Sequence, residues 1–328
     1  MVATPRTCAL LIALALSLPA RTARAETREW PTKYVRLIVP GSSGSAPDVM
    51  ARFIADRLTQ KWGQQVIVEN QPGAGGNIGV AAAARTAPDG YTLLFSQAAP
   101  LALNQHIFKQ MPFSIENDFD PVIFIGDGPM LIAASPKIGV KTIPELIARA
   151  KANPGKLSYA TPGVKNVPHL TGELFKSMTD VDMQHVSYRT NSQAITDTMT
   201  GVVDLVIDGV PALMPQIRAG NLVPLGVTSD RHLQGLEGLP LVSDTLSKFA
   251  ISGWFAVLAP KGTPPAIIAR LNSDIQAALQ IDELLARMRD LGVYRDLSNT
   301  TPEQLAAYIR AQSNMFGKIA QSAKIERD

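Results

Sequence analysis

The feature that most constrains the fold is a repeated alternation of short apolar runs with helical spacing. In the first third of the chain, buried strands are predicted at residues 34–40, 65–69 and 91–95. Gly/Ser loop 41–45 follows the first strand, and helical spacing of apolar residues begins at Val49. Short buried strands that alternate with helices indicate a mostly parallel sheet covered on both faces.

The same alternation starts again after about residue 130. The strands predicted there share short runs of apolar residues, and they are 131–133, 157–160, 183–186, 203–207, 222–227 and 253–259. The predicted helices share amphipathic spacing, and they are 144–152, 168–178, 193–200, 264–280, 282–291 and 302–320. A chain of this length exceeds what one core comfortably serves, so two α/β lobes are expected.

The N-terminus has the pattern of an export signal. Arg6 precedes an apolar run from Cys8 to Leu18, and Ala23-Arg24-Ala25 offers a small-x-small cleavage site. The run is about half of the roughly 20 residues that a spanning helix needs, so a retained anchor is the weaker interpretation. We predict cleavage after Ala25 and a periplasmic protein.

Charge and cysteine content exclude several classes of function. Residues 1–25 contain three of the 31 basic residues and no acidic residue. The mature chain would therefore have 28 basic and 28 acidic residues. A neutral mature chain offers no broad surface for nucleic acid. The only cysteine, Cys8, is removed with the leader, so disulfides, cysteine nucleophiles and cysteine-bound metals are not expected.

Two glycine-rich segments resemble enzyme motifs but depart from them. In segment 73–79, Ile78 stands where a dinucleotide fingerprint needs its third glycine. In segment 41–45, Ser45 stands where a nucleophile elbow needs glycine. None of the four histidines forms an i, i+4 ligand pair of the HExxH kind, so no metal and no cofactor is predicted. A periplasmic serine hydrolase that uses Ser43 or Ser45 remains the alternative function.

Several predicted strands end in loops of Gly, Ser, Thr and Asn that lead directly into a helix. In open α/β sheets, ligands bind outside these carboxyl ends of the strands. A helix N-terminus offers free N–H groups and partial positive charge, which favour an anion. Ser45 could serve instead as a helix cap, with Asp48 completing a capping box.

Specific segments in fixed order point to a known family. They are Val39-Pro40-Gly41 leading to Asp48 and Ala51-Arg52, residues 66–70 with 72–79, residues 87–93, residues 118–122, His169-Leu170 with residues 172–175, Val186-Ser187-Tyr188, Asp197, and Trp254-Phe255 ahead of residues 259–264. Over essentially the whole mature chain, these residues resemble the Bug-type (TctC-like) extracytoplasmic solute receptors of tripartite tricarboxylate transporters.

The resemblance implies a type II periplasmic-binding-protein fold with a ligand cleft between two lobes. Residues 26–126 and 226–328 would form lobe 1, and residues 127–225 would form lobe 2. A receptor of this kind closes around a small carboxylate without chemistry and presents it to membrane permease subunits or to a sensor. We therefore expect a monomeric binding protein rather than an enzyme, with aliphatic dicarboxylates as first candidates and aromatic ones such as terephthalate as second.

The resemblance also carries over a set of ligand-binding positions, all in or next to loops that follow strands. They are Pro40, Gly41, Ser42, Gly44, Ser45, Asp48, Ser96, Gln97, Thr161, Pro162, Gly163, Val164, Lys165, His169, Tyr188, Thr190, Asn191, Ala194 and Asp208. Lys165 stands in a loop where the family usually carries Gly-Thr, so it could bind a second ligand carboxylate or face solvent. His169 is interpreted first as a structural link, and Tyr188 either lines the cleft or packs beneath it.

Overall fold

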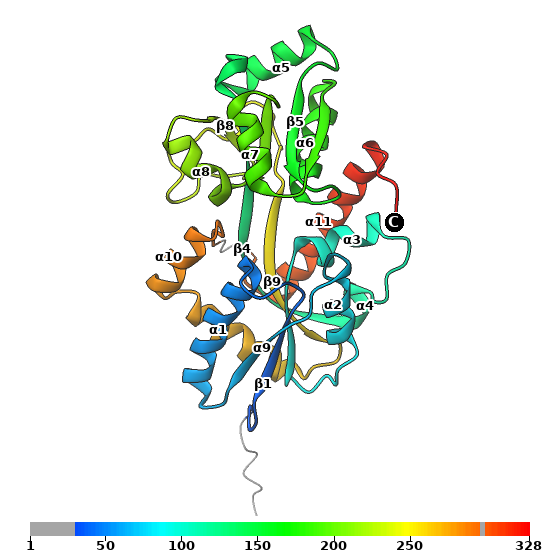
Figure 1. The fold of residues 1–328 in the computed structure, drawn as a ribbon. Coiled ribbons are helices and arrows are strands. Elements are labelled where there is room, and N and C mark those ends of the chain that lie inside the picture. The colour runs from blue at the N-terminus through cyan, green and yellow to red at the C-terminus, as the bar shows by residue number, and fades with distance from the viewer. Residues whose placement is uncertain (1–29, 296–298) are drawn as a thin grey trace, which may run out of the picture.

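The structure, a computed structural model, describes residues 30–295 and 299–328. Figure 1 shows two lobes at opposite ends of two long central strands, β4 (Phe119–Ala134) and β9 (Ser252–Pro260). The predicted leader and its cleavage site at Ala25 lie outside the described residues. Within those residues, no helix is long and apolar enough to cross a membrane.

Three parallel strands build the sheet of the lower lobe in Figure 1. They are β1 (Val35–Val39), β2 (Val66–Asn70) and β3 (Thr92–Gln97), in the order β2-β1-β3. β9 pairs antiparallel with β3, and β4 pairs antiparallel with β9. All residues of β1 except Arg36 are buried, because helices cover both faces of this sheet.

The upper lobe repeats this arrangement on the far half of β4. Its parallel strands are β5 (Ser158–Pro162), β6 (Gln184–Tyr188) and β7 (Leu205–Gly209), and β7 pairs antiparallel with β4. β8 (Val223–Val227) pairs with the same half of β4 from its other side. β4 therefore belongs to both halves of one continuous sheet.

Helical segments before the far half of β4 pack in the lower lobe, and they are α1 (Ala46–Trp62), η1 (Ala74–Gly76), α2 (Asn77–Ala84), the π-helix η2 (Ala99–Leu103), α3 (Asn104–Ile107) and α4 (Ile115–Asp118). The segments between β4 and β9 are η3 (Pro136–Ile138), α5 (Ile143–Ala152), α6 (Val167–Thr179), α7 (Asn191–Thr200), α8 (Val210–Arg218) and η4 (Val242–Asp244). After β9 come α9 (Pro265–Ala278), α10 (Asp282–Asp290) and α11 (Pro302–Ser322).

Aromatic packing fastens α11 to the two central strands. Trp254 on β9 is fully buried, and its ring centroid lies 5.4 Å from that of Tyr308 on α11. Tyr308 also makes an edge contact with Phe124 on β4, at 5.0 Å between centroids. Buried aromatic pairs of this kind add to the stabilisation that comes from area alone. The C-terminal helix is thereby anchored beside the region where the lobes meet.

The predicted α/β fold is confirmed, and most strands and helices lie within a few residues of their predicted bounds. Besides several helical segments of three to five residues, two longer features were missed. The chain was expected to contribute only residues 131–133 as a strand in this region, whereas β4 runs for 16 residues. Its centre, Gly126-Asp127-Gly128-Pro129, reads locally as a turn, but pairing with β9 holds it extended. Helix α8 was also missed, because Pro211 and Pro215 interrupt its helical pattern.

Candidate ligand-binding site

The strand register makes the carboxyl ends of the two parallel sheets point toward each other. On the lower side, Gln97 at the end of β3 pairs with Phe255, which pairs with Gly126 of β4. On the upper side, Gly209 at the end of β7 pairs with Met130 of β4. Gly126 and Met130 are four residues apart, which is about 13 Å along a strand. The loops predicted to bind ligand therefore flank one short stretch of β4.

The loop between β1 and α1 is shaped by a buried carboxylate. Asp48 is 2% exposed, and its Oδ2 accepts hydrogen bonds from the backbone N–H of Gly44 (2.8 Å) and from Nε of Arg52 (3.1 Å). Arg52 also donates to Oδ1 of Asn70 (3.1 Å), and Asn70 donates to the carbonyl of Gly41 (3.1 Å). Asp48 thus holds the predicted loop in place from inside.

The electrostatics of Asp48 agree with this structural role. Burial raises the pKa of Asp48, but the Arg52 guanidinium and the Gly44 N–H outweigh it and hold the pKa below its usual value. The carboxylate is therefore ionised: its Oδ2 accepts both hydrogen bonds, and its Oδ1 lies 2.9 Å from the Arg52 guanidinium. Direct contact between this negative charge and an anionic ligand would be repulsive, so a structural role for Asp48 is favoured.

The capping box considered for α1 is not formed. Ser45 is the N-cap residue, but its hydroxyl donates to the carbonyl of Ser42 (2.6 Å) and no side chain caps the helix. Asp48 reaches Gly44 instead of Ser45. Ser42 and Gly44 are exposed, whereas Pro40 is buried. The N-terminal turn of α1 consequently presents backbone N–H groups that no described side chain covers.

The end of β3 places one buried and one partly exposed polar residue beside this loop. Ser96 is fully buried, and its Oγ has no hydrogen-bond partner among the residues that the structure describes. Gln97 is partly exposed at the final position of the strand. A buried hydroxyl without a partner is rare in folded proteins. A polar group of a bound ligand next to Ser96 could supply the hydrogen-bond partner that its hydroxyl lacks.

In the upper lobe, the loop between β5 and α6 is held by its own side chains. The Thr161 hydroxyl donates to the carbonyl of Gly163 (2.7 Å). Asn166 caps α6 by accepting from the His169 N–H (3.0 Å) and donates to the carbonyl of Pro162 (2.6 Å). Gly163 and Lys165 have left-handed backbones, with φ of 92° and 56°. That conformation is costly for a lysine, which indicates a loop kept in a specific shape.

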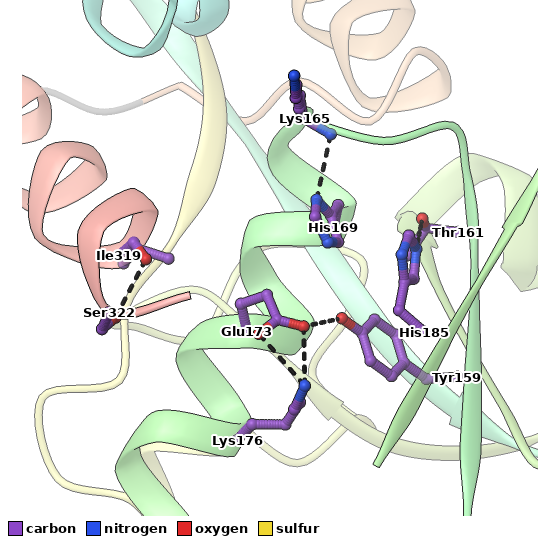
Figure 2. Close-up of polar contacts among 9 residues, drawn as sticks. All are labelled: Tyr159, Thr161, Lys165, His169, Glu173, Lys176, His185, Ile319 and Ser322. Atoms are coloured by element: carbon purple, nitrogen blue, oxygen red, sulfur yellow. Dashed lines mark hydrogen bonds and ion pairs between the residues drawn. The ribbon is translucent and has the colours of Figure 1, made fainter. Parts of the chain in front are cut away.

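Two histidines support this loop from behind (Figure 2). The Lys165 N–H donates to Nδ1 of His169 (3.1 Å), and Nε2 of His185 lies 2.7 Å from the Thr161 hydroxyl. The Thr161 proton is already used toward Gly163, so His185 must donate. Both rings therefore carry their proton on Nε2 when neutral. His169 is placed as the structural link that was its first interpretation, and Val164 between these contacts is 54% exposed.

The histidines lie in a buried polar cluster that disfavours their charged forms. Burial lowers the pKa of His185 to about 4, with the neighbouring His169 acting in the same direction. Burial also lowers the pKa of His169, although the Glu173 carboxylate opposes this shift. Glu173 in turn accepts from the Tyr159 hydroxyl (2.5 Å) and from Lys176 (3.1 Å). The loop consequently rests on neutral imidazoles at pH 7.

Lys165 forms an ion pair that joins the lobes at the chain's C-terminus. Its ammonium donates to the side-chain carboxylate of Asp328, the last residue. Asp328 is itself fastened to the lower lobe, because its backbone bonds to the carbonyl of Ile107 (2.9 Å) and to the N–H of Lys109 (2.7 Å). Figure 1 shows the C-terminus beside α3 and below α6. The Lys165 charge is thus paired with a carboxylate of the other lobe.

The remaining predicted residues follow β6 and β7. Thr190 caps α7 by accepting from the Gln193 N–H (3.3 Å), and Ala194 is buried in the core. Asn191 donates to Oδ2 of Asp208 (2.6 Å). This hydrogen bond links the start of α7 to the end of β7 in the upper lobe. Burial raises the pKa of Asp208 to about 6, although bonds from Gly209 and Asn191 oppose the shift.

Tyr188 lies at the end of β6 and packs against the upper core. Burial and the Asp197 carboxylate raise the pKa of Tyr188 to about 12. Its phenol is therefore engaged with α7 beneath the loops.

Sequence reasoning missed His185 and Asp328. His185 carries no motif and sits mid-strand, and it reaches Thr161 only because β5 and β6 pair in register. Asp328 lies 163 residues from Lys165, so no local pattern connects them. Within residues 30–295 and 299–328, no group of three or more His, Cys, Asp or Glu side chains could hold a metal ion.

Residues 50–325 match the family described as "Tripartite tricarboxylate transporter family receptor". Protein BugT of Bordetella pertussis (strain Tohama I) is 36% identical over 282 residues, which cover 85% of this chain and 86% of BugT. These similarities confirm the Bug-type, TctC-like resemblance.

Two solved structures with ligands share the fold. "R. palustris Rpa4515 with adipate" is 32% identical with a TM-score of 0.75, and the match covers 92% of this chain and 100% of that one. "MatC (Rpa3494) from Rhodopseudomonas palustris with bound malate" is 25% identical with a TM-score of 0.70, covering 88% of this chain and 99% of that one. The two-lobed periplasmic-binding-protein fold predicted from the sequence is thereby confirmed.

Proposed function

Because the chain belongs to the tripartite tricarboxylate transporter receptor family, and is a solute receptor rather than an enzyme, we propose that it captures a small dicarboxylate between its lobes. One observation carries this proposal. The carboxyl ends of the parallel strands in the two lobes point toward each other on either side of the middle of β4. The β1–α1 loop lies on one edge, and the β5–α6 loop lies on the other. A ligand between them would contact both lobes.

The donors on both edges suit a carboxylate. The first turn of α1 offers backbone N–H groups next to the exposed Ser42 and Gly44. Positive helix ends and clustered N–H groups favour anions. On the opposite edge, Gly163, Val164 and Lys165 form an exposed or half-exposed loop of fixed shape. The ligand would therefore be held mainly by backbone groups and hydroxyls.

A second carboxylate on the ligand would find a cation in Lys165. The side chain lies in the β5–α6 loop and is 20% exposed in its pair with Asp328. Two relatives carry adipate and malate, which are both dicarboxylates. Aliphatic dicarboxylates are accordingly our first ligand class, and aromatic ones such as terephthalate our second.

Closure would pivot on the middle of the two central strands. Asp127 lies between Gly126 and Gly128 on β4, opposite Trp254 on β9, and the pairing register shifts between Phe124 and Gly126. Glycine and an irregular register allow local bending of a strand. The proposed lobes are residues 26–126 with 226–328, and residues 127–225. Ligand would shift the population toward a closed form that a membrane permease or a sensor recognises.

The exported protein would be a periplasmic monomer with its leader cleaved after Ala25. N-terminal sequencing of protein purified from the periplasm of an expressing bacterium tests the cleavage site directly. A mature N-terminus at Glu26 is expected. A retained apolar segment would contradict this part of the proposal.

A thermal-shift screen tests the ligand class. The protein is unfolded and refolded to remove carried-over ligand, and then mixed with adipate, malate, terephthalate, hexanoate, amino acids and sugars. At a hundredfold excess over Kd, one-site binding adds about 2.7 kcal/mol, which raises the Tm by several degrees. A rise with dicarboxylates only is expected. A flat response to every acid, or hydrolysis of an ester that is lost in Ser43→Ala or Ser45→Ala, would overturn the proposal.

A further inference from the structure

A cavity lies where α10 meets the connection that follows β8, next to the backbone pairing of Tyr294 with Asp127. Its volume is about 410 Å³, within the size range of small-molecule sites. The apolar part of its wall comes from Leu285, Met288 and Val293. The charged part consists of Arg231, Arg289 and Arg295. An apolar wall beside three guanidinium groups is typical of a site for an organic anion.

The arginines differ in how far the protein already satisfies them. Arg231 is paired with Asp127 (3.0 Å) and Asp230 (3.1 Å). Arg289 donates to the neutral amide oxygen of Gln234 (3.2 Å). Nη1 of Arg295 is buried and has no hydrogen-bond partner in the described part of the chain. The Arg295 side chain is half-buried and one of its donors is unsatisfied, so an anion within reach of its guanidinium would gain a charge-assisted hydrogen bond.

The charges around the cavity are mixed, because Arg231 in its wall is paired with the carboxylates of Asp127 and Asp230. Among the described residues that line it, none is acidic. The neighbouring Tyr294 is buried, which raises its pKa, while the charges of Arg289 and Arg218 act in the opposite direction. The wall cations that remain to attract an anion are therefore Arg289 and Arg295.

The cavity also borders the strand that joins the lobes. Tyr294, in its wall, exchanges two backbone hydrogen bonds with Asp127 of β4 (2.7 and 2.8 Å). Arg231, also in its wall, bonds to the Asp127 carboxylate. At Gly292, a Cβ atom would lie 2.4 Å from Pro211 of α8, so this segment packs directly against the upper lobe. A ligand in the cavity would therefore lie beside the bend proposed for closure, against wall residues that all come from segment 226–328.

We infer that this cavity is a second binding site, distinct from the one between the strand ends, for a small organic monoanion with an apolar body. Its carboxylate pairs with Arg295 and Arg289, and its apolar part packs on Leu285, Met288 and Val293. The inference does not depend on which dicarboxylate the lobes enclose.

4-Bromobenzoate is a suitable probe, because its bromine can be located by anomalous scattering. In crystals of the exported protein grown with this probe, a bromine peak beside Leu285 and Met288 is expected, and excess adipate should not remove it. Bromine found only between the lobes, bromine that adipate displaces from the cavity, or no bromine would each overturn the inference.

Variants then test the arginines in solution. With 4-fluorobenzoate followed by ¹⁹F NMR, Arg295→Gln combined with Arg289→Gln should raise the probe's Kd at least tenfold. Arg149→Gln, an exposed position on α5, is the matched control and should leave the Kd unchanged. Circular dichroism melting confirms that each variant folds. A Kd that is equal in the double variant and in the control would contradict the assignment.

Discussion

The imidazole rings of His169 and His185 lie stacked, with 4.2 Å between centroids and 24° between planes. Each ring holds one residue of the β5–α6 loop, Lys165 through Nδ1 of His169 and Thr161 through Nε2 of His185. Protonation of His169 would place a donor at Nδ1 against the Lys165 N–H. The shape of the predicted ligand loop is therefore coupled to the charge of the stacked pair.

We predict that stability falls as the pH drops from about 6.5 toward 4. The folded protein lowers the pKa of both histidines, that of His185 to about 4, so the unfolded chain binds more protons in this window. Each histidine contributes at most about 1.4 kcal/mol per pH unit. Urea unfolding at a series of pH values measures the slope.

The matched variant for this slope is His169→Asn with His185→Gln. The Asn oxygen can still accept at the position of Nδ1, and the Gln amide can still donate at the position of Nε2, but neither titrates. The slope between pH 6.5 and 5 should become flatter. His232→Gln, at an exposed position outside the β5–α6 loop, is the control and should leave the slope unchanged. Parallel slopes in wild type and double variant would refute the coupling.

Asp208→Asn should stabilise the protein at pH 7.5 by about 1–2 kcal/mol. Burial raises the pKa of Asp208 to about 6, so its contribution is favourable when protonated and is lost as the pH rises through that value. The Asn oxygen can still accept from Asn191, but the bond that the Gly209 N–H donates to Oδ1 is lost, which limits the gain. Thermal melts at pH 7.5 and 5 measure the difference, which should shrink at the lower pH. A gain that is equal at both values would rule out this explanation.

Asp328→Asn should strengthen dicarboxylate binding about twofold to fivefold, because Lys165 loses its carboxylate partner and becomes available to the ligand. Lys165→Met should weaken adipate binding about tenfold and leave hexanoate binding unchanged. Calorimetric titration of both acids measures these effects. Lys151→Met, on the exposed face of α5, is the control. If Lys165→Met binds adipate as wild type does, Lys165 has only the structural pair with Asp328.

Gly126→Ala should destabilise the protein by about 2–3 kcal/mol, since its Cβ would lie 2.7 Å from the Tyr294 carbonyl oxygen. Gly128→Ala is a close control, because its nearest contact would be 3.4 Å from the Gly253 carbonyl oxygen. Urea denaturation compares the two. Equal losses would show that both positions respond to lost backbone freedom rather than to the contact with Tyr294.

Local sequence patterns predicted the strands, most of the helices and the loops between them. Val35–Val39 is an apolar run interrupted only by Arg36 and followed by Gly41, and this pattern can be read without any distant residue. The ligand positions predicted in loops 42–45 and 161–165 came from the family resemblance, and they agree with the rule that ligands bind where strands end and helices begin. The α/β class was therefore determined by local chemistry, whereas the site prediction needed the resemblance.

The tertiary structure decided which of those loops face each other and what their side chains contact. Gly126 to Pro129 reads locally as a turn, and only pairing with β9 extends it into a strand shared by both lobes. Asp48 was predicted among the ligand contacts, and in the structure its Oδ2 accepts hydrogen bonds from Gly44 and Arg52. The partners of Lys165 and Thr161 are distant in sequence, and hydrogen bonds between distant residues depend on strand register and helix packing. Periodicity along the chain cannot encode them, because it records burial and not which buried or charged groups meet.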